Sequence, residues 1–215
     1  MKYNTIIFDL DGTLLNTLDD LWASVNHAMR ENGFPERTRD EVRRFVGNGV
    51  KMLIKRSVPE GITEEQYWSA YNSFEKYYAI HSRDNTAPYD GILELVSTLK
   101  KNGCSVAIVS NKIDFAVKDL RDKFFKEIDV AIGDRDDTKN KPEPDMVFKA
   151  VKELGVDIKD CVYVGDTDVD LETAHNSGMD CISVSWGFRS REELEGYKAK
   201  MIADKACDIL KFLGL

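Results

Sequence analysis

The fold is decided by the stretch Asn4–Thr17, NTIIFDLDGTLLNT, in which a short apolar run ends in two aspartates one residue apart. The run Thr5–Phe8 predicts a buried strand. Its carboxyl end brings Asp9 and Asp11 into the same corner, where like charges raise each other's pKa unless a cation offsets them. The stretch therefore predicts a charged site at the end of a strand.

Further apolar runs of strand length recur along the chain. They are rich in Ile and Val and show little alternation, which is typical of strands buried on both faces of a parallel sheet. These runs are Ser105–Val109, Val130–Ile132, Cys161–Val164 and Cys181–Val184. Helical patterns between the later runs occur at Gly91–Lys101, Pro144–Leu154 and Val169–Asn176. This alternation predicts an α/β fold with a Rossmann-like open parallel sheet in a three-layer α/β/α arrangement.

Residues 16–83 interrupt this pattern because they are expected to be helical throughout. The expected helices are Leu18–Glu31, Arg39–Val46, Val50–Ser57 and Glu64–His81, separated by breaks that contain glycine or proline. An all-helical block of this kind predicts an inserted helical cap domain at 16–83. The α/β core, or catalytic, domain is then formed by 1–15 and 84–215.

Composition limits the possible functions. The 215 residues are 42% hydrophobic, which suits one domain with a smaller insertion, and the net charge of −8 argues against non-specific binding to nucleic acid. No apolar run approaches the ~18 residues of a membrane span, and no charged-then-apolar leader precedes the first strand. The 4 cysteines have no Cys-x-x-Cys spacing and are expected to be reduced. We expect a cytoplasmic protein, monomeric or a weak homodimer.

Polar residues follow the expected strands. Ser110, Asn111 and Lys112 come after the second strand, the segment Lys141–Pro144 follows the third beyond a polar loop, and Gly165–Asp170 follows the fourth. Ligands of open parallel sheets bind at the carboxyl ends of the strands, where such loops converge. The sequence therefore predicts one site assembled from distant segments.

The residue types suggest chemistry on a phosphate. Carboxylates Asp9, Asp11, Asp166 and Asp170 offer only oxygen, which suits Mg²⁺, and no His or Cys cluster favours zinc. Lys141 and the Ser110 hydroxyl could contact phosphate oxygens. One aspartate could attack phosphorus and form an aspartyl phosphate, while a second could transfer protons.

These residues resemble a known family. The segments Phe8–Leu14 (FDLDGTL), Ser110–Lys112 (SNK), Lys141–Pro144 (KPEP) and Gly165–Asp170 (GDTDVD) are similar, in order and spacing, to the four motifs of the haloacid dehalogenase superfamily. The resemblance runs from Ile6 to about Gly187. The helical insertion, Phe45–Val50 (FVGNGV) and Val184–Gly187 (VSWG) are similar to the phosphoglycolate phosphatase branch. One departure is Asn16-Thr17, where many relatives carry Asp-Ser, at the expected cap hinge.

The resemblance implies roles for the charged residues. Asp9 would be the nucleophile and a Mg²⁺ ligand. Asp11 would be the general acid and base, with its backbone carbonyl on the metal. Asp166 would be the third protein ligand of the ion. Lys141 would neutralise phosphate and nucleophile, and Asp170 would support the metal site or hold Lys141.

It also implies roles for neutral residues. Ser110 would bind the phosphoryl group, with Asn111 beside it as a second phosphate-binding residue. Gly12 and Thr13 would shape the turn beside the phosphate. The helical insertion would be a mobile cap that closes over the substrate and excludes bulk water.

The cap offers candidate substrate contacts. Backbone amides of Gly47, Asn48 and Gly49, together with Lys51, could reach the non-phosphate end of the substrate, or this segment could be only a turn between helices. A nearby basic run is expected to be a solvated helix face and consists of Arg43, Arg44, Lys55 and Arg56.

The leading hypothesis is Mg²⁺-dependent hydrolysis of a small-molecule phosphomonoester, with 2-phosphoglycolate as the first substrate to try. Alternatives with the same nucleophile are a phosphomutase of the β-phosphoglucomutase type and a pyrophosphatase. A dehalogenase is disfavoured because it needs neither an acid at Asp11 nor a Mg²⁺ cluster. A hypothesis from another class is a non-catalytic phospho-acceptor module, although response-regulator receivers lack a helical insertion after the first strand.

Overall fold

The computed structural model describes residues 2–215 and divides the chain into two compact units. The α/β unit comprises the chain up to Leu15 together with Pro88–Leu215, and the helical unit comprises Asn16–Ala87. The expected second boundary, between residues 83 and 84, lies in the turn after the last helix of the helical unit. The division into a core and a cap domain stays a prediction.

The α/β unit is built on a six-stranded parallel sheet with the order β5-β4-β1-β6-β7-β8. Its strands are β1 (Thr5–Phe8), β4 (Ser105–Ile113), β5 (Val130–Asp134), β6 (Cys161–Gly165), β7 (Asp180–Val184) and β8 (Met201–Ala203). Strand β1 is central, because Thr5 pairs with Ser105 of β4 on one side and with Cys161 of β6 on the other. The predicted fold class is confirmed.

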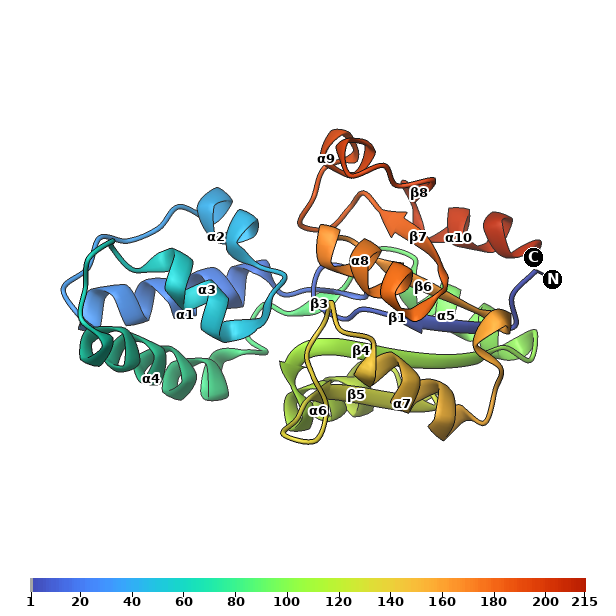
Figure 1. Ribbon diagram of the computed structural model, residues 1–215, viewed down its shortest axis with the longest axis horizontal. Helices are drawn as coiled ribbons and strands as arrows, with labels where there is room; N and C mark the ends of the chain where they lie inside the picture. The colour runs from blue at the N-terminus through green and yellow to red at the C-terminus, as the bar shows by residue number, and fades with distance from the viewer. Residues whose placement is uncertain (1) are drawn as a thin grey trace. The chain divides into compact units, whose positions relative to one another are not determined.

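Helices cover both faces of this sheet (Figure 1). Helices α5 (Ile92–Lys101), α6 (Asp114–Phe124) and α10 (Ala206–Leu213) pack on one face, and α7 (Asp145–Leu154) and α8 (Asp168–Ser177) on the other. A short helix α9 (Arg191–Gly196) and a 3₁₀ turn (Ile158–Asp160) complete the unit. Phe8 belongs to the first apolar layer and Ile7 to the second, which is why the strand runs show no polar alternation.

Two features of the sheet differ from expectation. The edge strand β8 was not expected, because its three residues lie between charged neighbours and give no distinct apolar run. Strand β4 continues beyond Val109 to Ile113 after a shift of register. Ser110, Asn111 and Lys112 therefore form the irregular end of β4 rather than a loop after it, and this part of the prediction is corrected.

The helical unit contains α1 (Leu18–Glu31), α2 (Arg39–Phe45), α3 (Gly49–Ser57) and α4 (Glu64–His81), close to the expected helices. Capping boxes begin α2 at Thr38 and α4 at Thr63. Of the aromatic residues of α4, Phe74 and Tyr78 are buried while Trp68 is exposed, so only some of them pack inside the unit. The short strands β2 (Leu15–Asn16) and β3 (Ala87–Pro88) pair where the chain enters and leaves the unit.

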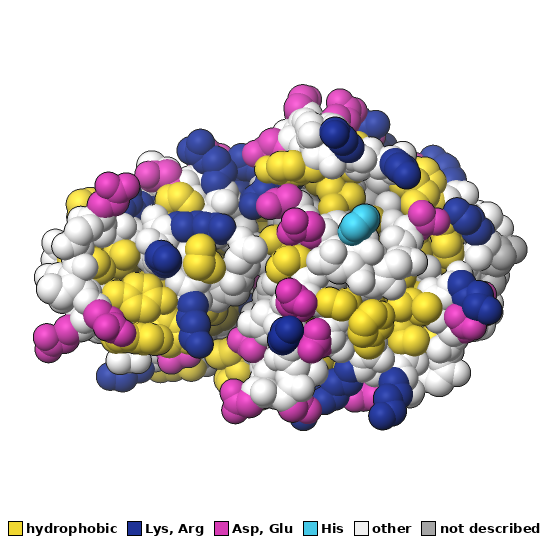
Figure 2. Space-filling model, in the orientation of Figure 1, with side chains coloured by type: hydrophobic (Ala, Val, Ile, Leu, Met, Phe, Trp, Pro, Cys, Tyr) yellow, Lys and Arg dark blue, Asp and Glu magenta, His cyan; other side chains and the backbone are white. Residues whose placement is uncertain are grey.

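Surface charge is mixed. Acidic and basic side chains alternate over the face drawn in Figure 2, without a large field of one sign there. Across residues 2–215, no helix combines the length and apolarity needed to cross a membrane.

Asp20 ties the two ends of the helical unit together. This buried side chain of α1 accepts hydrogen bonds from the backbone N–H groups of Asn85 and Thr86 at 2.9 Å each, and from the Thr86 hydroxyl at 2.7 Å. The Asn85 side-chain amide donates at 3.0 Å. The carboxylate thus satisfies the N–H and hydroxyl of buried Thr86, which would otherwise be left without partners.

We expect Asp20→Ala to lower the free energy of unfolding by about 1–3 kcal/mol, because it leaves buried donors unsatisfied. Asp19→Asn is the matched control, since this neighbour is half-exposed and pairs with Arg39. Asp19→Asn should lower the free energy of unfolding by less than about 1 kcal/mol. Urea unfolding checks both variants, and equal stabilities for the two would contradict the role given to Asp20.

Candidate functional site

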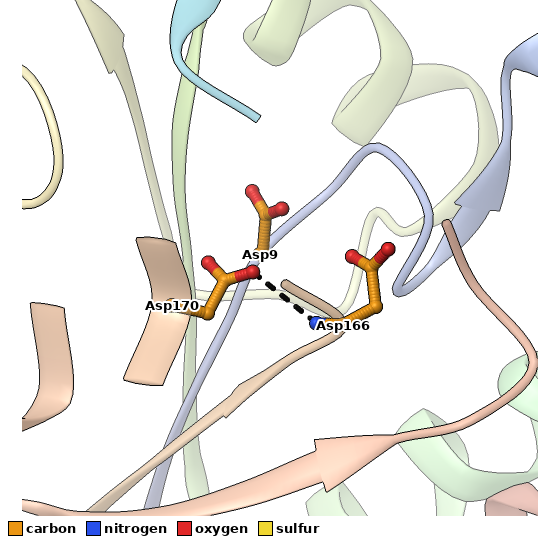
Figure 3. Close-up of side chains that lie close together, drawn as sticks. All are labelled: Asp9, Asp166 and Asp170. Carbon is orange, nitrogen blue, oxygen red and sulfur yellow. Dashed lines mark hydrogen bonds between the residues drawn. The ribbon is translucent and has the colours of Figure 1, made fainter. Parts of the chain in front are cut away.

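Predicted site residues from distant segments meet at the carboxyl edge of the sheet. Asp9 directly follows β1, Asp166 directly follows β6, and Asp170 lies in the first turn of α8. A carboxylate oxygen from each lies within 4.8 Å of the others, and all three residues are buried. Figure 3 shows the carboxylates of Asp9 and Asp166 pointing to the same side, with that of Asp170 beside Asp9.

Lys141 supplies the positive charge of this cluster. Its Nζ lies 2.8 Å from Asp9 Oδ1 and 2.7 Å from Asp170 Oδ1, and it is 3.1 Å from the hydroxyl of Tyr163. The contact with Asp9 is an ion pair without good hydrogen-bond alignment, whereas Asp170 accepts a hydrogen bond. Burial favours a lower pKa for Lys141, but Asp170 and Asp9 outweigh it and raise the pKa well above the usual value.

Neutral donors hold the Asp166 carboxylate. The Thr13 hydroxyl donates to its Oδ1 at 2.9 Å and the Phe188 backbone N–H to its Oδ2 at 2.7 Å. Among residues 2–215 it forms no ion pair with a lysine or arginine. Burial, followed by the charges of Asp170 and Asp9, raises the pKa of Asp166 well above its usual value.

The cluster has the composition of a divalent cation site. Burial raises the pKa of Asp9 to about 7, although Lys141 opposes this shift. When ionised, the three carboxylates exceed the one ammonium group of Lys141 by two charges. An oxygen-only donor set with an uncompensated charge of this size suits a hard divalent ion such as Mg²⁺. The residues therefore fit the expected ion.

Asp170 is occupied by protein groups. Its Oδ1 contacts Lys141 and the Tyr163 hydroxyl, at 2.7 and 3.3 Å. Its Oδ2 accepts from the backbone N–H and the hydroxyl of Thr167, at 3.0 and 2.8 Å. Asp170 thus contacts Lys141, as one of its two expected roles requires, and it also caps the start of α8. Its expected role toward the metal site stays a prediction.

Glycines let the backbone approach these carboxylates. A Cβ at Gly12 or Gly187 would overlap the Asp166 side chain, and one at Gly165 would overlap Asp170. Gly12 also has φ +90°, a conformation that side chains other than glycine rarely adopt. The walls of the site are thus formed directly by main chain.

Ser110 and Asn111 are both buried beside the cluster. The Asn111 amide donates to the Lys141 carbonyl at 3.0 Å and accepts from the Lys141 N–H at 2.8 Å, so it fixes the backbone that carries the lysine. The Ser110 hydroxyl oxygen accepts from the Lys112 N–H at 3.2 Å. Their expected contacts with phosphate stay predictions.

The candidate substrate residues of the helical unit form a separate feature. Gly47 and Gly49 have positive φ, and Arg56 donates to the Phe45 carbonyl at 2.6 Å and to Asn48 Oδ1 at 2.8 Å. Arg56 therefore braces this turn rather than being only part of a solvated face, whereas Arg43 and Arg44 both pair with Asp40. Lys51 is exposed on α3, and the role of these residues toward substrate stays a prediction.

Sequence reasoning missed two contributors and gave two others no role. Tyr163, which contacts Lys141, and Phe188, whose backbone N–H contacts Asp166, were not expected at the site. Lys112 and Gly187 were quoted within motifs, but the contact of Lys112 with Asp11 and the close approach of Gly187 to Asp166 were not expected. A tyrosine in an otherwise aliphatic buried strand was the available signal for Tyr163. No side-chain pattern marks a backbone donor such as that of Phe188.

Comparison with known proteins identifies relatives over nearly the whole chain. The family described as haloacid dehalogenase-like hydrolase matches residues 6–184. A pyrophosphatase PpaX of Bacillus cereus is 31% identical over 218 residues, covering 99% of this chain and 97% of that protein. Phosphoglycolate phosphatase 1 of Pseudomonas aeruginosa is 29% identical, covering 95% of this chain and 78% of that protein.

Solved structures of similar proteins match this chain over nearly its whole length. A candidate phosphoglycolate phosphatase from Lactobacillus delbrueckii subsp. bulgaricus superposes with a TM-score of 0.93 at 36% identity, covering 97% of each chain. A predicted phosphoglycolate phosphatase from Haemophilus somnus gives a TM-score of 0.91 at 27% identity, covering 99% of each.

We expect Mg²⁺ to stabilise the wild type, by about 2.7 kcal/mol at 100 times its Kd, and Asp166→Asn to abolish this effect. The metal-free Asp166→Asn variant should be more stable than the metal-free wild type, because it removes a buried carboxylate that lacks a cation. Thermal unfolding with and without Mg²⁺ measures both effects. Asp168→Asn, in the same segment but paired with Arg189, is the control and should keep the Mg²⁺ response.

Gly187→Ala should destabilise the chain by about 1–3 kcal/mol and weaken its response to Mg²⁺, because the added methyl group displaces Asp166. Gly196→Ala is the control, since a Cβ there meets nothing within 4 Å. The same unfolding assay applies. A Gly187→Ala variant as stable and as metal-responsive as Gly196→Ala would refute the close packing.

Proposed function

This chain belongs to the haloacid dehalogenase-like hydrolases, and on that premise we propose that it hydrolyses a small phosphomonoester through a phosphorylated Asp9. The observation that carries the proposal is the pair Asp9–Lys141, buried beside Asp166. A carboxylate with an ammonium group at 2.8 Å is well placed to accept a phosphoryl group, because the lysine offsets the repulsion between two anions.

The carboxylates of Asp9 and Asp166 would hold Mg²⁺ together with the backbone carbonyl of Asp11. Asp170 is left out of this set because Lys141, Tyr163 and Thr167 already engage its oxygens. When bound, the ion would offset the charge of the phosphate and of the groups that surround it. Thr13 and Phe188 would keep the Asp166 carboxylate aimed at the ion.

The protein groups then divide the reaction into two displacements. In the first, an Asp9 oxygen forms a bond to phosphorus while the ester P–O bond breaks, and Asp11 gives its proton to the leaving oxygen. In the second, Asp11 takes a proton from water, whose oxygen attacks the same phosphorus. The Asp9–phosphorus bond breaks, and inorganic phosphate and the free carboxylate are released.

Two substrates are supported by the relatives. The phosphoglycolate phosphatases favour 2-phosphoglycolate, and the pyrophosphatase relative of matching length favours inorganic pyrophosphate as a second candidate. The same site residues would serve the hydrolysis of either substrate and also a phosphomutase reaction. The match to a hydrolase family over residues 6–184 argues against a non-catalytic receiver module.

The helical unit would act as the cap that encloses the substrate. Its turn at Gly47–Gly49 and Lys51 would contact the part of the substrate beyond the phosphate. A small phosphorylated metabolite is then the partner of this protein, which we expect to work in the cytoplasm as a monomer or weak homodimer, without binding nucleic acid or membranes.

Phosphate release from a panel containing 2-phosphoglycolate and pyrophosphate tests the proposal. We expect hydrolysis of at least one compound, complete loss with EDTA, and a loss of about 10³-fold or more in Asp9→Asn, because an amide cannot serve as the nucleophile. Asp19→Asn, at a half-exposed position on α1, is the control and should keep full activity. Normal turnover by a folded Asp9→Asn variant would overturn the assignment.

A further inference from the structure

A second buried lysine contacts the other aspartate of the DLDGT segment. Lys112 Nζ lies 3.0 Å from Oδ1 and 3.3 Å from Oδ2 of Asp11, so one ammonium group engages both carboxylate oxygens. The two side chains are 5% and 16% exposed. Lysine is almost never buried to this degree without a partner. The ion pair with Asp11 is therefore a structural part of the site and not a chance surface contact.

The backbone around this contact is also constrained. The Lys112 N–H donates to the Ser110 hydroxyl at 3.2 Å, at the irregular end of β4. Asp11 takes part in an isolated bridge with Leu15 in the turn after β1. The ion pair therefore links two anchored segments that are far apart in the sequence, and its geometry limits where the Asp11 carboxylate can point.

The two buried lysines, Lys112 and Lys141, form ion pairs with different carboxylates. Lys141 is shared between Asp9 and Asp170, whereas Lys112 contacts Asp11. Asp11 is close enough for its charge to act on buried Asp9, so a freely rotating Asp11 carboxylate would be repelled away from the nucleophile. An ammonium group on one side of Asp11 opposes that repulsion and restricts the carboxylate to one orientation.

We propose that Lys112 is a positioning residue that holds the Asp11 carboxylate in place for proton transfer to the leaving group and from water. The inference rests on the proposed function, in which Asp11 is the acid and base. Lys112 itself exchanges no proton in either step and forms no bond to substrate. Its contribution is to keep Asp11 oriented while the ester bond breaks.

Leaving groups of different basicity test this role. An alkyl phosphate needs a proton on its departing oxygen, whereas 4-nitrophenyl phosphate releases a stable anion. For Lys112→Met, kcat/KM should fall about 10²-fold with the alkyl phosphate and less than about 10-fold with the aryl phosphate. Lys112→Arg, which keeps the charge and two-oxygen contact, should recover most of the alkyl activity.

Lys118→Met is the matched control, because this half-exposed lysine of α6 pairs with Asp114 and not with Asp11. It should leave both rates unchanged. An equal loss of both rates in Lys112→Met, or no loss, would overturn the positioning role. If Lys112→Met does not fold, Lys112→Gln replaces it, and its loss of kcat/KM with the alkyl phosphate is compared with its loss with the aryl phosphate in the same way. The proposed function is tested separately by Asp9→Asn: normal turnover by that variant would contradict the nucleophile assignment without bearing on Lys112.

Discussion

One ammonium group shared between Asp9 and Asp170 makes it possible to bury three carboxylates together at the edge of this sheet. Like charges in a region of low polarity repel strongly, and removing them from water is costly. Lys141 offsets part of that repulsion, and its backbone is fixed from the neighbouring strand by the Asn111 amide. Among residues 2–215 no lysine or arginine pairs with Asp166, and the excess negative charge that results suits a divalent cation.

The parallel sheet places these groups where they can act together. Asp9 and Asp166 follow adjacent strands, β1 and β6, in register, so two segments separated by more than half of the chain end at the same edge. Apolar layers on both faces keep the strands rigid, while the main chain at Gly12 and Gly187 approaches Asp166 closely. Rigid elements of this kind hold reacting groups more accurately than mobile loops.

Much of this site is predictable because its residues have both chemical character and a position at a strand end. The convergence of Asp9, Lys141, Asp166 and Asp170 follows from the carboxyl-edge rule for parallel sheets. The short edge strand β8 does not follow, since a run of three residues is too short to carry a periodic signal. The contacts of Tyr163 and Lys112 depend on side-chain directions across neighbouring strands, which spacing alone does not specify.

The two ends of the helical unit lie next to each other, which bears on how such a unit can be inserted into a fold. Asp20 near its beginning holds Asn85 and Thr86 near its end, and the strands at the two crossings pair with each other. A segment whose ends are adjacent can be inserted into a surface connection with little disturbance to the host sheet. If the helical unit contacts the substrate as proposed, exchanging it for a segment of another length or shape would change the substrate while the carboxylate cluster stays the same.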